Sequence, residues 1–116
     1  MRHVAKQAKK KRKPFTEPVL LILTSLSGEP RHGYALIKDI ENLSHGRVRL
    51  STGTLYGAIR RLLEAGWIEP FDQEDTSRDK QAYRLTSAGR KELESELKRM
   101  KELTQKATAR LKTQRA

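Results

Sequence analysis

The apolar residues of this chain fall into segments with helical spacing and two short segments with strand character. In the first segment, residues 19–26 are apolar on nearly every side, which predicts a helix that must be covered from two directions. Thr16, followed two residues later by Pro18, favours a helix start, because proline is tolerated in a first turn. Gly28 and Pro30 predict where this helix ends.

Two further helices are predicted in the middle of the chain. Residues 31–34 predict a turn into a helix of about ten residues. After the polar loop 44–49, Ser51 is a suitable cap for the next helix, and Gly66 suits the left-handed residue just past its end. The apolar positions are Leu36, Ile37, Ile40 and Leu43 in the first of these helices and Leu55, Ile59 and Leu62 in the second.

The last part of the chain predicts a two-stranded hairpin and a long helix. Residues 68–71 and 81–85 have strand character and flank a polar tip, 72–80. Thr86 is a suitable cap for a helix of about 25 residues, roughly 35–40 Å long. That is longer than a three-helix core of this size needs, so the helix should project and pair with a partner helix. Its apolar face consists of Leu93, Leu97, Met100, Thr104, Ala107 and Leu111, widened by Leu103.

Charge adds a candidate partner to this picture. The 116 residues contain 25 Lys and Arg against 14 Asp and Glu, for a net charge of +11. Seven of the basic residues lie in residues 1–13, which contain no acid, so the remainder of the chain carries only +4. An excess of this size favours a polyanion, with nucleic acid ahead of an anionic membrane. The basic arm, predicted to be disordered, is either a solubilising tail or a nonspecific phosphate binder through Lys9, Lys10, Lys11, Arg12 and Lys13.

Composition also excludes several classes of protein. No stretch approaches the roughly 20 apolar residues of a membrane span. Without cysteine there is no disulfide scaffold and no thiolate ligand, which fits a cytoplasmic protein. His3, His32 and His45 form no i, i+4 pair, so no metal site is expected. Since no catalytic constellation is visible either, we expect neither an enzyme nor a cofactor.

Three motifs, in this order and spacing, carry a resemblance to a known family. They are His32-Gly33-Tyr34, Gly53-Thr54-Leu55-Tyr56, and Tyr83-Arg84-Leu85-Thr86 followed by Gly89. Together with Gly66-Trp67-Ile68 they make residues 15–100 similar to the PadR-like transcriptional regulators. The resemblance implies a mainly α fold with a small β-hairpin, that is, a winged helix-turn-helix with a long C-terminal dimerisation helix. The expected division is a basic arm at 1–14, the DNA-binding domain at 15–86 and the dimerisation helix at 87–116.

The function implied is that of a homodimeric repressor, usually bacterial, which binds double-stranded DNA. In such proteins the third helix enters the major groove, the wing contacts the flanking DNA, and the C-terminal helix packs on the partner's first helix. A small-molecule effector is common in the family and is left open here, as is association with the nucleoid. The alternative is a nonspecific architectural nucleic-acid-binding protein in which the basic arm dominates.

Candidate DNA contacts cluster at the start of the third helix. Small side chains there would let the helix end, with its unpaired amides, approach a phosphate or a base edge. Tyr56 and Arg60 lie opposite the apolar stripe and should point away from the core; the alternatives are a packing role for Tyr56 and a solvated charge at Arg60. For Arg61 the choice between a DNA contact and a solvated charge stays open. The candidates are Ser51, Thr52, Gly53, Thr54, Tyr56, Arg60 and Arg61.

Further candidates lie around this helix and at the dimer contact. Gly57 departs from the family, in which proline is common at this place. In the wing, the resemblance points to Arg78 and Lys80, although the tip also holds four acids, which reduce affinity for DNA. Other phosphate candidates are Arg31, His32, Arg47 and Arg49. The residues expected at the dimer contact are Leu20, Leu23, Leu93, Leu97, Met100, Leu103, Ala107 and Leu111.

Overall fold

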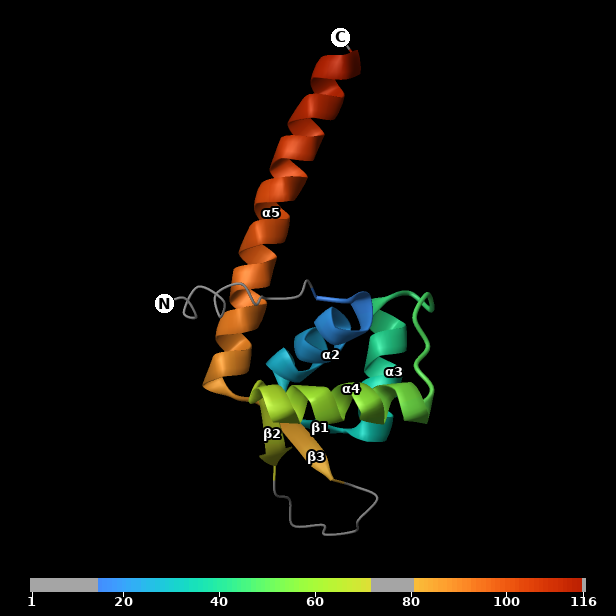
Figure 1. Ribbon diagram of the computed structural model, residues 1–116. Helices are drawn as coiled ribbons and strands as arrows, with labels where there is room; N and C mark the ends of the chain where they lie inside the picture. Colours follow the sequence, from blue (N-terminus) through green and yellow to red (C-terminus); the bar gives the residue numbers. More distant parts are fainter. Residues whose placement is uncertain (1–14, 72–80, 116) are drawn as a thin grey trace, which may run out of the picture.

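The structure, a computed structural model, describes residues 15–71 and 81–115 (Figure 1). Three helices pack together over a small sheet, and a fourth, much longer helix projects away from them. The predicted fold class, a winged helix-turn-helix with a long C-terminal helix, is confirmed. In chain order the elements are α2 Glu17–Gly28, β1 Arg31–His32, α3 Gly33–Leu43, α4 Thr52–Ala65, β2 Ile68–Phe71, β3 Ala82–Leu85 and α5 Ser87–Arg115.

The helix ends follow the caps that the sequence predicts. The Thr16 hydroxyl accepts a hydrogen bond from the Val19 amide at 3.2 Å and so begins α2. The Ser51 hydroxyl accepts from the Thr54 amide at 3.1 Å at the start of α4. Gly66 ends α4 with φ +80°, in the left-handed region that glycine adopts without strain.

The sheet has three strands and not the two that the pattern predicts. Residues Arg31–His32, expected to be only a turn, pair with β3 as the short strand β1, giving the antiparallel order β1-β3-β2. A two-residue strand is too short to show alternation in the sequence. It forms because β3 offers it a free edge next to the start of α3.

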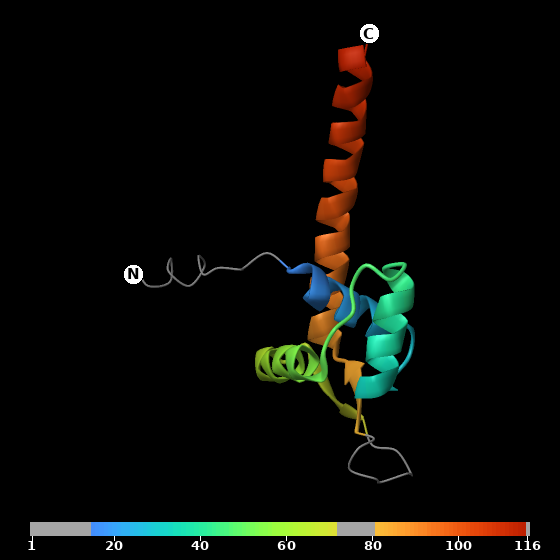
Figure 2. The same ribbon diagram turned by 90° about the vertical axis from the view of Figure 1, so that its right-hand side faces the viewer.

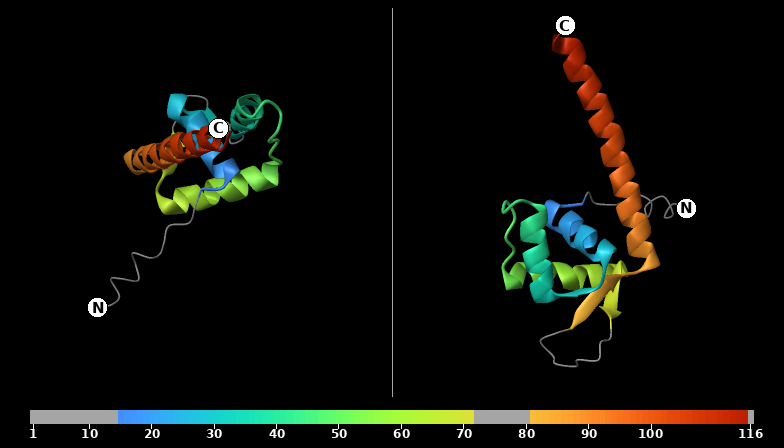
Figure 3. Two further views of the ribbon diagram at one scale, coloured as in Figure 1. Left: turned by 90° about the horizontal axis from the view of Figure 1, so that it is seen from above. Right: turned by 180° about the vertical axis from the view of Figure 1, so that it is seen from behind.

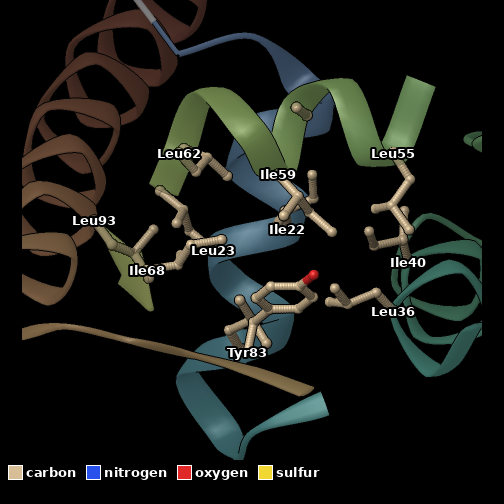
Figure 4. Packing of buried hydrophobic residues seen from close by; sticks show 12 residues of the cluster. Ile22, Leu23, Leu36, Ile40, Leu55, Ile59, Leu62, Ile68, Tyr83 and Leu93 are labelled. Atoms are coloured by element: carbon tan, nitrogen blue, oxygen red, sulfur yellow. The ribbon is translucent and has the colours of Figure 1, made fainter. Parts of the chain in front are cut away.

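The core lies between α2, α3, α4 and the sheet (Figure 4). Leu55, Ile59 and Leu62 of α4 are buried as their spacing predicts. Leu93 brings the first turns of α5 into the same core. The largest fully buried side chains are Ile22, Leu23, Leu36, Ile40, Leu55 and Ile59.

Helix α5 leaves this core soon after it begins. It contains 29 residues, somewhat more than predicted, and spans about 43 Å at 1.5 Å per residue. From Leu97 to Gln114 every side chain is exposed. Figures 1 and 2 show that α5 runs away from the end of the molecule where β2 ends and β3 begins. The view from behind in Figure 3 shows the compact triangle of α2, α3 and α4 beside it.

Candidate nucleic-acid interface

The start of α4 is exposed, but two of its hydroxyls are already in use. Ser51 accepts from the Thr54 amide and donates to the Thr54 hydroxyl oxygen at 3.0 Å. The Ser51 hydroxyl is therefore used as both donor and acceptor in fixing the first turn of α4, whereas the Thr54 hydroxyl accepts and keeps its own hydrogen free to donate. Thr52 and Gly53 are exposed beside them.

Two glycines on α4 are not required by packing. A Cβ added at Gly53 would have no atom within 4 Å, and one added at Gly57 would meet only the end of the Arg61 side chain, at 3.9 Å. Nothing within the described fold forbids a side chain at either position. Their small size thus keeps the outer surface of α4 open to the close approach of another molecule.

The spacing of Tyr56 with Arg60 predicts that the Tyr56 side chain points away from the core, but in the structure it does so only in part. It is 41% exposed, and its hydroxyl oxygen would lie only 2.1 Å from a Cβ added at Gly33. Helical side chains lean toward the N-terminus of their helix, and this carries the phenol ring of Tyr56 over the first residue of α3. Burial, and to a smaller degree the nearby Tyr56, raise the pKa of Tyr83. The contact of the Tyr56 hydroxyl with Gly33 fits the alternative role of Tyr56, packing, better than the role of a free hydrogen-bond donor to a phosphate.

Arg60 and Arg61 are both exposed on the outer side of α4. Arg60 has no ion pair within the described parts of the chain, which leaves its five N–H donors available. Arg61 extends back over Gly57 and also lines a hollow between α2 and α4. Of the two, Arg60 is therefore the side chain with fewer protein neighbours.

Arg31 joins two elements of the fold, and its expected contact with a phosphate stays a prediction. Its Nε donates to the Ser25 carbonyl at 3.1 Å and lies 3.6 Å from Asp39, while a terminal nitrogen lies 3.3 Å from Glu29. Asp39 also accepts from the buried Ser25 hydroxyl at 2.6 Å. The guanidinium thus joins α2 to α3, and sequence spacing alone could not show these partners.

The other basic candidates differ in their exposure and in their ion pairs. His32 is half-buried in β1. Arg49 is well exposed and lies 3.2 Å from Glu41, and the exposed Arg47 pairs with Glu17. Surface pairs of this kind contribute only about 0–1 kcal/mol, so Arg49 could exchange its carboxylate for a phosphate. Arg78, Lys80 and the arm candidates Lys9, Lys10, Lys11, Arg12 and Lys13 lie outside the described residues.

The base of the wing offers an arginine that the sequence patterns did not single out. Arg84 on β3 lies 2.8 Å from Glu69, its cross-strand neighbour on β2, and 5.2 Å from the centre of the Phe71 ring. The pair fixes the two strands just before they reach the tip. Only the strand register reveals the contact.

The third motif holds the start of α5 in place. The Thr86 hydroxyl donates to the Gly66 carbonyl at 2.6 Å and accepts from the Gly89 amide at 3.0 Å, while its own amide donates to the Trp67 carbonyl at 3.0 Å. A Cβ added at Gly89 would lie 2.0 Å from the Trp67 oxygen. The start of α5 is therefore held directly against the end of α4.

Sequence reasoning left Tyr34 and Lys38 without a role. Tyr34 appears only as a letter of the first motif, yet it is 68% exposed, and the Lys38 ammonium lies 5.8 Å from the centre of its ring. Both lie on the side of α3 opposite the buried Leu36 and Ile40. Their position opposite the apolar stripe can be read from the sequence and would have predicted that both side chains are exposed.

The residues expected at a dimer contact fall into three groups by their exposure. Leu23 and Leu93 are buried in the core of their own chain, at 0% and 5% exposure, so a direct contact with a partner is wrong for both. Leu20 is half-buried. Five are exposed along one side of α5: Leu97, Met100, Leu103, Ala107 and Leu111.

Among residues 15–71 and 81–115, no group of three or more histidines, aspartates and glutamates is placed to hold a metal ion. None of the described helices is both long and apolar enough to cross a membrane.

Comparison with solved structures identifies the fold independently of the motifs. A transcriptional regulator from Clostridium thermocellum superposes with a TM-score of 0.65 at 28% identity, over 78% of this chain and 88% of the other. A PadR family transcription regulator from Clostridium difficile gives a TM-score of 0.69 at 21% identity, over 83% of this chain and 99% of the other. The second likeness is one of fold alone.

Sequence relatives are longer than this chain. Transcriptional regulator YqjI of Escherichia coli is 34% identical over 91 residues, which are 78% of this chain and 42% of YqjI. An uncharacterised 37.1 kDa protein of transposon TN4556 from Streptomyces fradiae is 38% identical over 85 residues, 73% of this chain and 23% of the relative. This chain thus spans less than half of either relative. A profile of the transcriptional regulator PadR-like family matches residues 22–95, which contain all three motifs, and the chain belongs to that family.

Proposed function

We propose that this chain is a sequence-specific repressor that binds a pseudo-palindromic DNA site as a homodimer, with α4 in the major groove. One observation carries the proposal: the outer side of α4 combines open backbone at Gly53, and a Gly57 covered only by the end of Arg61, with an Arg60 that has no ion pair among the described residues. Glycine admits a base edge or a phosphate close to the helix, and arginine is the most frequent reader of guanine.

The exposed apolar side of α5 supports the homodimer. Leu97, Met100, Leu103 and Leu111 are each more than a third exposed on one projecting helix, and apolar side chains gain free energy when a second helix covers them. Since the projecting end of α5 and the strands β2 and β3 lie at opposite ends of the molecule (Figures 1 and 2), pairing through that part of α5 would leave α4 free for DNA.

A small effector has a candidate site beside α4. A hollow of about 340 Å³ lies between the start of α2 and the end of α4, with Phe15 stacked on Trp67 at a centroid distance of 5.4 Å and Arg61 at its wall. Aromatic walls suit a planar apolar ligand. A ligand there would touch the helix that we assign to the DNA groove, so its binding would be linked to that of DNA. We place the protein in the bacterial cytoplasm, where its DNA would be.

The test is a footprint on genomic DNA followed by titration of the protected site. The proposal expects a site with dyad symmetry, bound at least a thousandfold more tightly than random DNA, which is about the lower range for specific binders. Equal affinity for both DNAs would instead favour the nonspecific architectural alternative.

Deletion of residues 1–13 also distinguishes the sequence-specific regulator from the nonspecific architectural protein. If the wing domain reads sequence, the truncated protein keeps its preference for the site and shows a shallower dependence of affinity on salt, because fewer counterions are released. Loss of all binding on truncation would favour the architectural protein.

A further inference from the structure

The exposed side of α3 carries a tyrosine and a lysine that the fold does not use. Tyr34 is the most exposed large aromatic residue among those described, and Lys38 lies one turn later with its ammonium 5.8 Å from the ring centre. An aromatic ring left in water forgoes the free energy of burial. A cation held over such a ring is positioned more closely than a free lysine.

The carboxylates of α3 are already committed to other cations. Asp39 accepts from Ser25 and lies 3.6 Å from Arg31, and Glu41 lies 3.2 Å from Arg49. Within the described part of the chain, Lys38 therefore has no carboxylate partner. Its charge remains available to an anion from outside.

The position of α3 places this pair beside the proposed DNA surface. Gly33, the neighbour of Tyr34, lies against the Tyr56 hydroxyl of α4. His32, which precedes Gly33, pairs with Ala82 of β3. Ala82 also pairs with Phe71 at the end of β2. The first turn of α3 thus lies between α4 and the base of the wing, at the end of the molecule away from α5 (Figures 1 and 2).

We infer that Tyr34 and Lys38 bind the phosphate backbone of DNA next to the groove that α4 enters. The Tyr34 hydroxyl donates one hydrogen bond to a phosphate oxygen, and the Lys38 ammonium neutralises one phosphate. Contacts to phosphates position a protein on DNA without reading its sequence. This inference rests on the proposed function and adds to it a pair of residues outside the recognition helix.

The test compares the full-length variants Lys38→Gln and Tyr34→Phe with a matched control, Lys112→Gln, which removes an equally exposed charge from the far end of α5. Binding to the footprinted site and to random duplex DNA is measured over a range of salt concentrations. Because the proposed homodimer carries each side chain twice, Lys38→Gln should reduce the slope of log K against log salt by about 1.8, which is about 0.9 for each phosphate contact. Tyr34→Phe should weaken binding about three- to tenfold for each of the two hydrogen bonds lost, with the slope unchanged.

Both losses should be equal on the specific and the random DNA, and Lys112→Gln should change neither affinity nor slope. Because both side chains are exposed, the melting temperatures of the variants should equal that of the wild type. A wild-type slope in Lys38→Gln together with wild-type affinity in Tyr34→Phe would overturn this inference and leave the proposed function standing. Failure of the unaltered protein to bind any duplex DNA would overturn both.

Discussion

Glycine serves two purposes in this domain: at two positions it makes room for packing, and at two others it leaves a surface open. Gly33 and Gly89 lie where a side chain would overlap Tyr56 or the Trp67 carbonyl, whereas Gly53 and Gly57 face open space. All four stand in the same motifs or between them, and the letter G does not distinguish them. Only the neighbours show that the first pair serves packing and that the second pair leaves a surface open.

Substitution by alanine should separate these purposes. In Gly89→Ala the new Cβ would overlap a backbone oxygen that cannot swing away, so we expect a loss of about 2–3 kcal/mol in the free energy of unfolding. Gly53→Ala should stabilise the helix by up to about 1 kcal/mol and yet weaken binding to the operator. Urea denaturation and DNA titration of both variants measure this, and a Gly53→Ala protein with unchanged affinity would argue against close approach at α4.

Arg60 should contribute to sequence preference. Replacement by alanine removes its donors without touching the core, so we expect about 1–3 kcal/mol less discrimination at one base pair and wild-type thermal stability. Competition between operator and random DNA gives the measurement. Equal losses on both DNAs would mean that Arg60 contacts only phosphate.

At the level of elements, the sequence predicts whatever depends on local periodicity and caps. Helices α2, α3 and α4 begin near their predicted residues because Thr16 and Ser51 cap them or because an apolar stripe starts there. Strand β1 was missed, since its pairing with β3 depends on residues far apart in the chain. For the same reason the sequence could not show that Arg31 binds Asp39 or that Tyr56 covers Gly33.

The start of α5 offers a test of how strongly two elements are joined. Thr86→Val keeps the shape of the side chain but removes the hydroxyl that bonds Gly66 and Gly89. We expect a loss of about 1–2 kcal/mol in the free energy of unfolding, as for other helix caps. The neighbouring exposed Ser87, changed to alanine, is the control and should lose little.

For the molecule as a whole, the apolar side of α5 leads us to expect two copies in solution. The double variant Leu97→Glu and Leu103→Glu places a charge at each edge of that side, so light scattering at micromolar concentration should report the mass of a single chain for it and of two for the wild type. Lys106→Gln, a change on an exposed part of the same helix, should leave the mass of two chains. A wild type that scatters as one chain would contradict the homodimer.

The attachment of α5 to the end of α4 has a geometric consequence for such a dimer. Because Thr86 and Gly89 fix the direction in which a helix of about 43 Å departs, a tilt of about 10° at this joint would move its far end by roughly 7 Å. A second chain bound along α5 would be carried with it, together with its own α4. In such a dimer the distance between the two α4 helices, which would have to match one turn of DNA at about 34 Å or a multiple of it, would depend on the three hydrogen bonds and the glycine of this joint.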